Sequence, residues 1–61
     1  MTNEELLAIA EVAMLKATRQ KQDATDLQRA INTLEFCVKS GDKESIDFAR
    51  AVLLTELEEL K

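Results

Sequence analysis

The chain has 61 residues, of which 46% are hydrophobic and 33% charged, and its formal net charge is −4. This length limits it to a single helical domain over residues 1–61, and the balance of apolar and charged residues is typical of a folded chain rather than a disordered one. With one cysteine and no histidine, an internal disulfide and a Cys/His zinc site are excluded. The negative charge argues against nucleic acid as the primary partner, because phosphate binding needs clustered cations.

Neither a secretory signal nor a membrane span is visible in the sequence. Glu4, Glu5 and Glu11 interrupt the apolar residues near the N-terminus, whereas a signal peptide has a basic start followed by an unbroken apolar stretch. No apolar run approaches the ~20 residues that a bilayer span needs. The unpaired Cys37 is typical of a reducing compartment. We therefore expect a cytoplasmic protein without a membrane partner.

Alanine, leucine and glutamate dominate and proline is absent, which predicts an all-α fold, here a small three-helix bundle. Thr2 and Glu5 have the spacing of a capping box, so we expect the first helix over Thr2–Arg19. Val12 and Leu15 lie on its polar side despite being apolar. Its predicted core face, with Leu7 at the edge, consists of Leu6, Ile9, Ala10, Ala13, Met14 and Ala17.

A turn is predicted at residues 20–24, because the chain from Lys16 to Asp26 has no large apolar residue. An alternative stays open, since residues at heptad spacing continue without a break from Leu6 to Val38. One long helix over Thr2–Lys39, giving a long helical hairpin, is therefore physically possible. Three helices are the favoured reading.

The second helix is expected over Thr25–Lys39. Asp23 or Thr25 would cap it, and Thr25 to Gln28 has the pattern of a second capping box. Its predicted core face, with Cys37 beside it, consists of Leu27, Ala30, Ile31, Leu34 and Val38. Phe36 lies nearly opposite that face.

Gly41 is the only glycine and is expected to end the second helix in a left-handed conformation. Asp42 follows as a candidate N-cap for a third helix over Asp42–Leu60. Its predicted core face, with Val52 on the flank, consists of Ile46, Ala49, Leu53, Leu57 and Leu60. Phe48 and Leu54 lie away from that face.

The apolar residues outside the core faces form the candidate protein interface. Large apolar patches on small proteins mark contact surfaces, and aromatic residues are enriched at interface centres. Two alternatives stay open: these side chains are ordinary exposed apolar groups or part of a wider core, and Phe36 folds over the Gly41 turn onto the last helix. The candidates are Phe36, Phe48, Val52, Leu54, Val12 and Leu15.

No constellation of catalytic, metal-binding or cofactor-binding residues is recognisable. Histidine is absent, Cys37 has no partner that would activate it, and a single glycine cannot form a phosphate-binding loop. The acidic residues have the distribution of a solvated face. We therefore expect no enzymatic activity, no cofactor, no metal and no identifiable small-molecule substrate.

These features predict a small acidic interaction protein, of the kind found among bacterial or phage regulators and inhibitors. It would act as a homodimer or higher oligomer, or by binding a larger protein. The alternative is a helical dimer that binds RNA or DNA through a basic stripe. The residues of that stripe, which would also suit an acidic partner, are Lys16, Arg19, Lys21 and Arg29.

Overall fold

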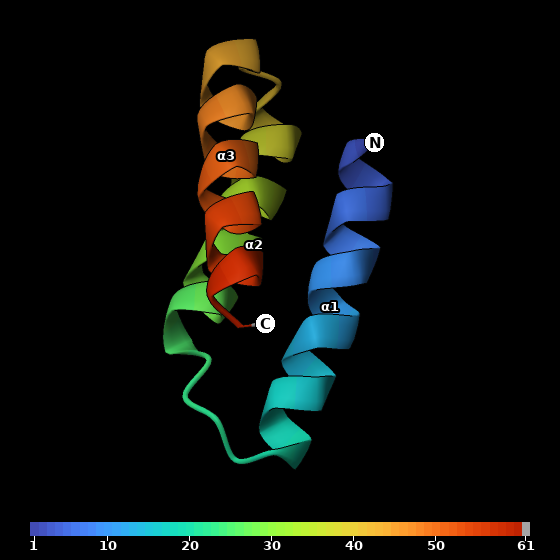
Figure 1. The fold of residues 1–61 in the computed structure, drawn as a ribbon. Helices are drawn as coiled ribbons and strands as arrows, with labels where there is room; N and C mark the ends of the chain where they lie inside the picture. The colour runs from blue at the N-terminus through green and yellow to red at the C-terminus, as the bar shows by residue number, and fades with distance from the viewer. Residues whose placement is uncertain (61) are drawn as a thin grey trace.

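The computed structural model describes residues 1–60, which form three α-helices (Figure 1). They are α1 (Asn3–Arg19), α2 (Thr25–Ser40) and α3 (Lys43–Glu59). α1 and α3 run in the same direction and α2 runs against both, so each helix packs against the other two. The bundle measures 34 × 17 × 16 Å along its principal axes. The three-helix prediction is confirmed, and the alternative of one long helix over Thr2–Lys39 is wrong.

Both ends of α1 are fixed by local hydrogen bonds. At the start, Oγ1 of Thr2 accepts from the backbone N–H of Glu5 at 3.1 Å, and the Glu5 carboxylate accepts from the Thr2 N–H at 3.3 Å. The predicted capping box is therefore confirmed. At the other end, Lys21 has a φ of 56°, and the N–H of Gln22 donates to the carbonyl of Ala17 at 2.9 Å. This left-handed closure stops α1 where the heptad pattern would have continued.

The second predicted capping box does not form. Asp23 Oδ1 accepts from the backbone N–H of Thr25 at 3.1 Å and from its hydroxyl at 2.7 Å. The Thr25 hydroxyl is thus engaged outside the helix, and the N–H of Gln28 bonds instead to the carbonyl of Ala24 at 2.9 Å. Of the two predicted caps, Asp23 is the one that satisfies an orphan donor of the first turn.

The turn between α2 and α3 matches its prediction. Gly41 is left-handed with a φ of 77°, and its N–H donates to the carbonyl of Cys37 at 3.0 Å. Asp42 then caps α3, because its carboxylate accepts from the N–H of Glu44 at 3.3 Å and from the Ser45 hydroxyl at 2.8 Å. The short turn holds α2 and α3 as a tight antiparallel hairpin, against which α1 packs less closely.

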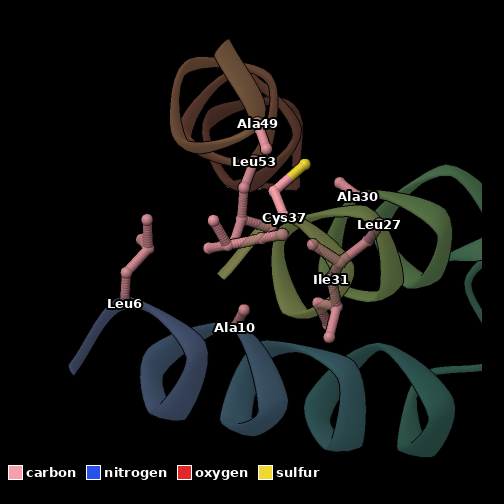
Figure 2. Close-up of a cluster of buried hydrophobic side chains, with 9 residues drawn as sticks. Leu6, Ala10, Leu27, Ala30, Ile31, Cys37, Ala49 and Leu53 are labelled. Carbon is pink, nitrogen blue, oxygen red and sulfur yellow. The ribbon is translucent and has the colours of Figure 1, made fainter. Parts of the chain in front are cut away.

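The core lies where the three helices meet, and Figure 2 shows its side chains converging from all of them. Its largest fully buried residues are four leucines, at least one from each helix: Leu6, Leu27, Leu34 and Leu53. Small residues fill the space between them, so the helices approach closely. Within residues 1–60, the buried set contains no polar or charged residue.

Two residues assigned to the core faces lie outside the core. Ile9 is 47% exposed and Val38 is 39% exposed. On α1 the contact is the narrow seam through Leu6 and Ala10, and Ile9 lies at the edge of that seam. α2 packs more closely against α3 than against α1, and near its end Cys37 is buried whereas Val38 is not.

Candidate functional site

The two phenylalanines, which are all the aromatic residues of the chain, are exposed to an unusual degree. Phe36 on α2 is 73% exposed and Phe48 on α3 is 71% exposed. The alternative in which Phe36 folds over the turn onto α3 is therefore wrong. A phenylalanine buries 150–250 Å² when it is covered, so two uncovered rings represent a large unrealised gain in burial.

A groove of about 260 Å³ runs between α2 and α3. Its walls include Thr33 on α2 together with Phe48 and Val52 on α3. Phe36 is one helical turn from Thr33 and two turns from Arg29, another lining residue, so it lies on the same side of α2. These five residues define the hairpin face, which is the outer side of the α2–α3 hairpin.

Phe36 and Phe48 also lie at about the same height on the hairpin face. Phe36 comes five residues before Gly41 and Phe48 seven residues after it. At the helical rise of 1.5 Å per residue, the two rings are roughly 8 and 10 Å from the turn. Because the helices are antiparallel, the two rings lie at a similar level of the hairpin.

The far end of the same groove is charged. Arg29 and Asp26 come from α2, and Glu56 comes from α3. Partial burial raises the pKa of Glu56, and the neighbouring charges of Glu59 and Asp26 raise it further. The hairpin face therefore has an aromatic end near the turn and an end of mixed charge away from it.

Another groove, of about 420 Å³, lies between α1 and α2. Leu15, Met14 and Ile31 supply apolar lining, and its charged lining residues are the carboxylates Glu11 and Glu35. We call it the acidic groove. Leu15 is as exposed as the sequence predicted, so the acidic groove is a further apolar surface with a single sign of charge.

The remaining predicted interface residues point elsewhere. Leu54 is exposed, but six residues separate it from Phe48, which places it about 120° around the axis of α3. Val12 is exposed on α1. The structure places Phe48 and Val52 in the walls of one groove, helical spacing puts Phe36 on the groove side of α2, and Val12, Leu15 and Leu54 lie on other sides. Sequence reasoning omitted Thr33 from this surface, although its spacing of three residues from Phe36 was a usable signal.

All four residues of the predicted basic stripe are exposed. Arg29 lies in the wall of the α2–α3 groove, next to the carboxylates described above. Lys16 and Arg19 are on α1, and Lys21 is in the turn that follows it. A continuous stripe built from two chains stays a prediction.

Comparison with known protein families, with curated proteins and with solved structures finds no match to this chain. Across residues 1–60, no three acidic or cysteine side chains gather in a way that would hold a metal ion. In the same part of the chain, none of the helices has both the length and the apolar character needed to cross a bilayer. The hairpin face is the surface on which a functional argument can be built.

Proposed function

We propose that this chain is a non-enzymatic helical protein–protein interaction module, and that the hairpin face is its contact surface. It acts as a homo-oligomer or by binding a larger protein, in the manner of a small regulatory or inhibitory protein. The observation that carries this proposal is the joint exposure of Phe36 and Phe48, at 73% and 71%, on the two helices of the α2–α3 hairpin. Aromatic residues dominate the energetics of protein interfaces, where truncation of a central residue costs about 2 kcal/mol or more.

The size of the chain supports the same proposal. A domain of about 60 residues buries only ~60% of its unfolded surface and is marginally stable alone. Disulfides, structural metals and oligomerisation are the usual supports for such small domains. With one cysteine and no histidine, covering an exposed apolar face is the route that this chain offers.

The test compares two matched pairs of substitutions. Phe36→Ser with Phe48→Ser removes the aromatic patch, and Val12→Ser with Leu15→Ser removes two comparably exposed residues on α1. Light scattering at about 100 µM measures self-association, and capture from an extract of the native host measures binding to another protein. We expect whichever association occurs to be lost in the phenylalanine variant and kept in the α1 variant.

Circular dichroism establishes that both variants stay helical, which is expected because the replaced side chains are exposed. The proposal is contradicted if the wild-type chain neither associates with itself nor retains a target. It is equally contradicted if association persists unchanged without the two phenylalanines.

A further inference from the structure

The acidic groove carries charges of one sign, and in this it differs from the groove of the hairpin face. Its charged lining residues are Glu11 on α1 and Glu35 on α2. The α2–α3 groove instead combines the guanidinium of Arg29 with the carboxylates of Asp26 and Glu56. Complementary charges across an interface favour the right partner and fix its register. The lining of the acidic groove therefore indicates which chemistry it would bind.

The two carboxylates stand on opposite walls of the acidic groove, at a similar level. Glu11 lies eight residues before Arg19, the last residue of α1, and Glu35 lies ten residues after Thr25, the first residue of α2. At the helical rise of 1.5 Å per residue, they are roughly 12 and 15 Å from the connecting turn. Because α1 and α2 are antiparallel (Figure 1), a cation that enters the groove at this level lies between them.

Apolar side chains line the groove on the side toward the connecting turn. Met14 and Leu15 follow Glu11 by about one turn of α1, and Ile31 precedes Glu35 by about one turn of α2. Leu15 is 64% exposed, so an apolar side chain placed here would be shielded from water together with it. The groove thus offers two carboxylates and, about 6 Å away along the helices, an apolar surface.

The cations nearest to this groove along the sequence lie beyond its ends. Lys39 follows Glu35 by one turn and Arg19 ends α1, and neither is a lining residue. Toward the connecting turn an adjoining hollow is lined by Asp23 and Arg29, whose charges are opposite. The negative charge is therefore concentrated at the level of the two carboxylates, which sets where a partner's cation would lie.

We propose that the acidic groove binds an amphipathic helix of a separate, basic protein. An arginine or lysine of that helix lies between Glu11 and Glu35. A large apolar residue one turn away on the same helix packs against Met14, Leu15 and Ile31. This is the helix-in-groove mode of recognition, in which anchors repeat at helical spacing.

The charge of the chain argues against the other occupants. A second copy of the acidic groove would oppose carboxylate to carboxylate, and the net charge of −4 repels a further copy in general. A nucleic acid would bring phosphates to the same carboxylates. This inference goes beyond the proposed function, because it concerns a different surface from the hairpin face.

The acidic groove is small, so its contact is expected to be weak. Its lining is far short of the roughly 20–30 residues that each partner contributes to a standard interface. We expect a dissociation constant on the order of 100 µM and rapid dissociation. Such a contact is lost during the washes of a capture experiment, which therefore reports on the hairpin face alone.

The test is a nuclear magnetic resonance titration of the full, isotope-labelled chain with three helical peptides of about 18 residues, or five turns. All three carry the same stripe of leucines. Arginines stand one turn before the leucines in the first peptide and one turn after them in the second, so that both helix directions are sampled. Glutamates replace the arginines in the third. We expect the amide signals of Leu15, Gln28 and Ile31 to shift with one of the arginine peptides and to stay unchanged with the glutamate peptide.

Neutralising variants show whether the groove or the overall charge is responsible. Glu11→Gln with Glu35→Gln should weaken peptide binding about fivefold or more. Asp47→Asn with Glu58→Gln changes the net charge equally at two exposed carboxylates of α3. This control should weaken binding by less than about twofold, because charges remote from the groove are screened.

Several results would overturn the inference, and each leaves the proposed function to be judged separately. They are groove signals that stay unchanged with both arginine peptides on the order of 1 mM, equal binding of the glutamate peptide, and equal weakening by the control variant. Groove signals that shift when the chain alone is concentrated would make the occupant a second copy. Peptide binding that survives Leu15→Ser but is lost in Phe48→Ser would place the peptide on the hairpin face.

Discussion

Arg50 on α3 donates a hydrogen bond from Nη1 to the side-chain oxygen of Asn3 at the start of α1, over 2.7 Å. Its Nη2 donates to the backbone carbonyl of Met1, also over 2.7 Å. One half-buried guanidinium therefore ties the first turn of α1 to α3. Because α1 packs less closely than the other two helices, this polar tie holds the most weakly attached element of the bundle.

Replacing Arg50 by alanine should lower the free energy of unfolding by about 1–2 kcal/mol, since hydrogen bonds to charged groups contribute about 1.5–3 kcal/mol and this pair is partly solvated. Arg50→Lys should recover little of the loss, because an ammonium group lacks the planar fork that reaches two acceptors. Urea denaturation measures both effects. A double-mutant cycle with Asn3→Ala should give a positive coupling energy, and additive effects would contradict the tie.

Lys21 closes α1 with a φ of 56°, a left-handed backbone conformation that residues with a Cβ rarely adopt. We expect Lys21→Gly to raise the free energy of unfolding by about 0.5–1 kcal/mol, because glycine relieves the strain but loses some of that gain to the entropy of the unfolded chain. The reciprocal control is Gly41→Ala, at the other left-handed residue. It should destabilise by about 1 kcal/mol through backbone strain alone, since a Cβ at Gly41 would meet nothing within 4 Å. Equal signs for the two variants would contradict this account of the turns.

Leu53 and Leu54 are neighbours with opposite environments, and they form a matched pair. Leu53 is fully buried, whereas Leu54 is 43% exposed. Leu53→Ala should cost about 2–5 kcal/mol, which is most of the roughly 3–9 kcal/mol expected for a chain of this length. Leu54→Ala should change the stability by less than about 1 kcal/mol. Thermal unfolding measured by circular dichroism distinguishes them, and a similar cost for both would mean that α3 is rotated from the described position.

The carboxyl of Glu56 should make stability depend on pH in the direction opposite to a paired acid. Burial raises its pKa above the ordinary 4.5, and the neighbouring charges of Glu59 and Asp26 raise it further. The folded chain therefore binds a proton more tightly than the unfolded chain, so stability falls as the pH rises from 4.5 through the raised pKa. Glu56→Gln should stabilise the protein at pH 7 and have little effect below pH 4. The free energy of unfolding of the wild type and of Glu56→Gln is measured between pH 4 and pH 7. A variant that is less stable than the wild type at pH 7 would contradict the raised pKa.

Much of the fold could be predicted because the decisive signals are local. The Thr2–Glu5 capping box, Gly41 and Asp42 act within a few residues, and each appears in the structure as expected. The composition predicts the position of the turn after α1, but nothing in it marks Lys21 as left-handed. Ile9 and Val38 are predicted to lie in the core but are exposed. Periodicity locates the centre of a helix face, but it does not show how closely the neighbouring helix packs against the edges of that face.

The candidate surface was predictable in part for a related reason. That Phe36 lies off the core face follows from its position within one helix, and the same is true of Phe48. That both lie on one side of the hairpin depends on how α2 and α3 are rotated against each other, which is set by the burial of Ala30, Ala49 and Leu53. Tertiary packing of this kind leaves no mark on the periodicity of a single helix.

The most direct test of the central claim is a nuclear magnetic resonance dilution series on the isolated, isotope-labelled chain. Amide signals are followed from the lowest measurable concentration to the millimolar range. The account predicts that the signals of Thr33, Phe36, Phe48 and Val52 shift together with concentration, while those of Ala8 and Val12 on α1 stay constant. Signals that are constant throughout, or that shift mainly along α1, would contradict self-association through the hairpin face.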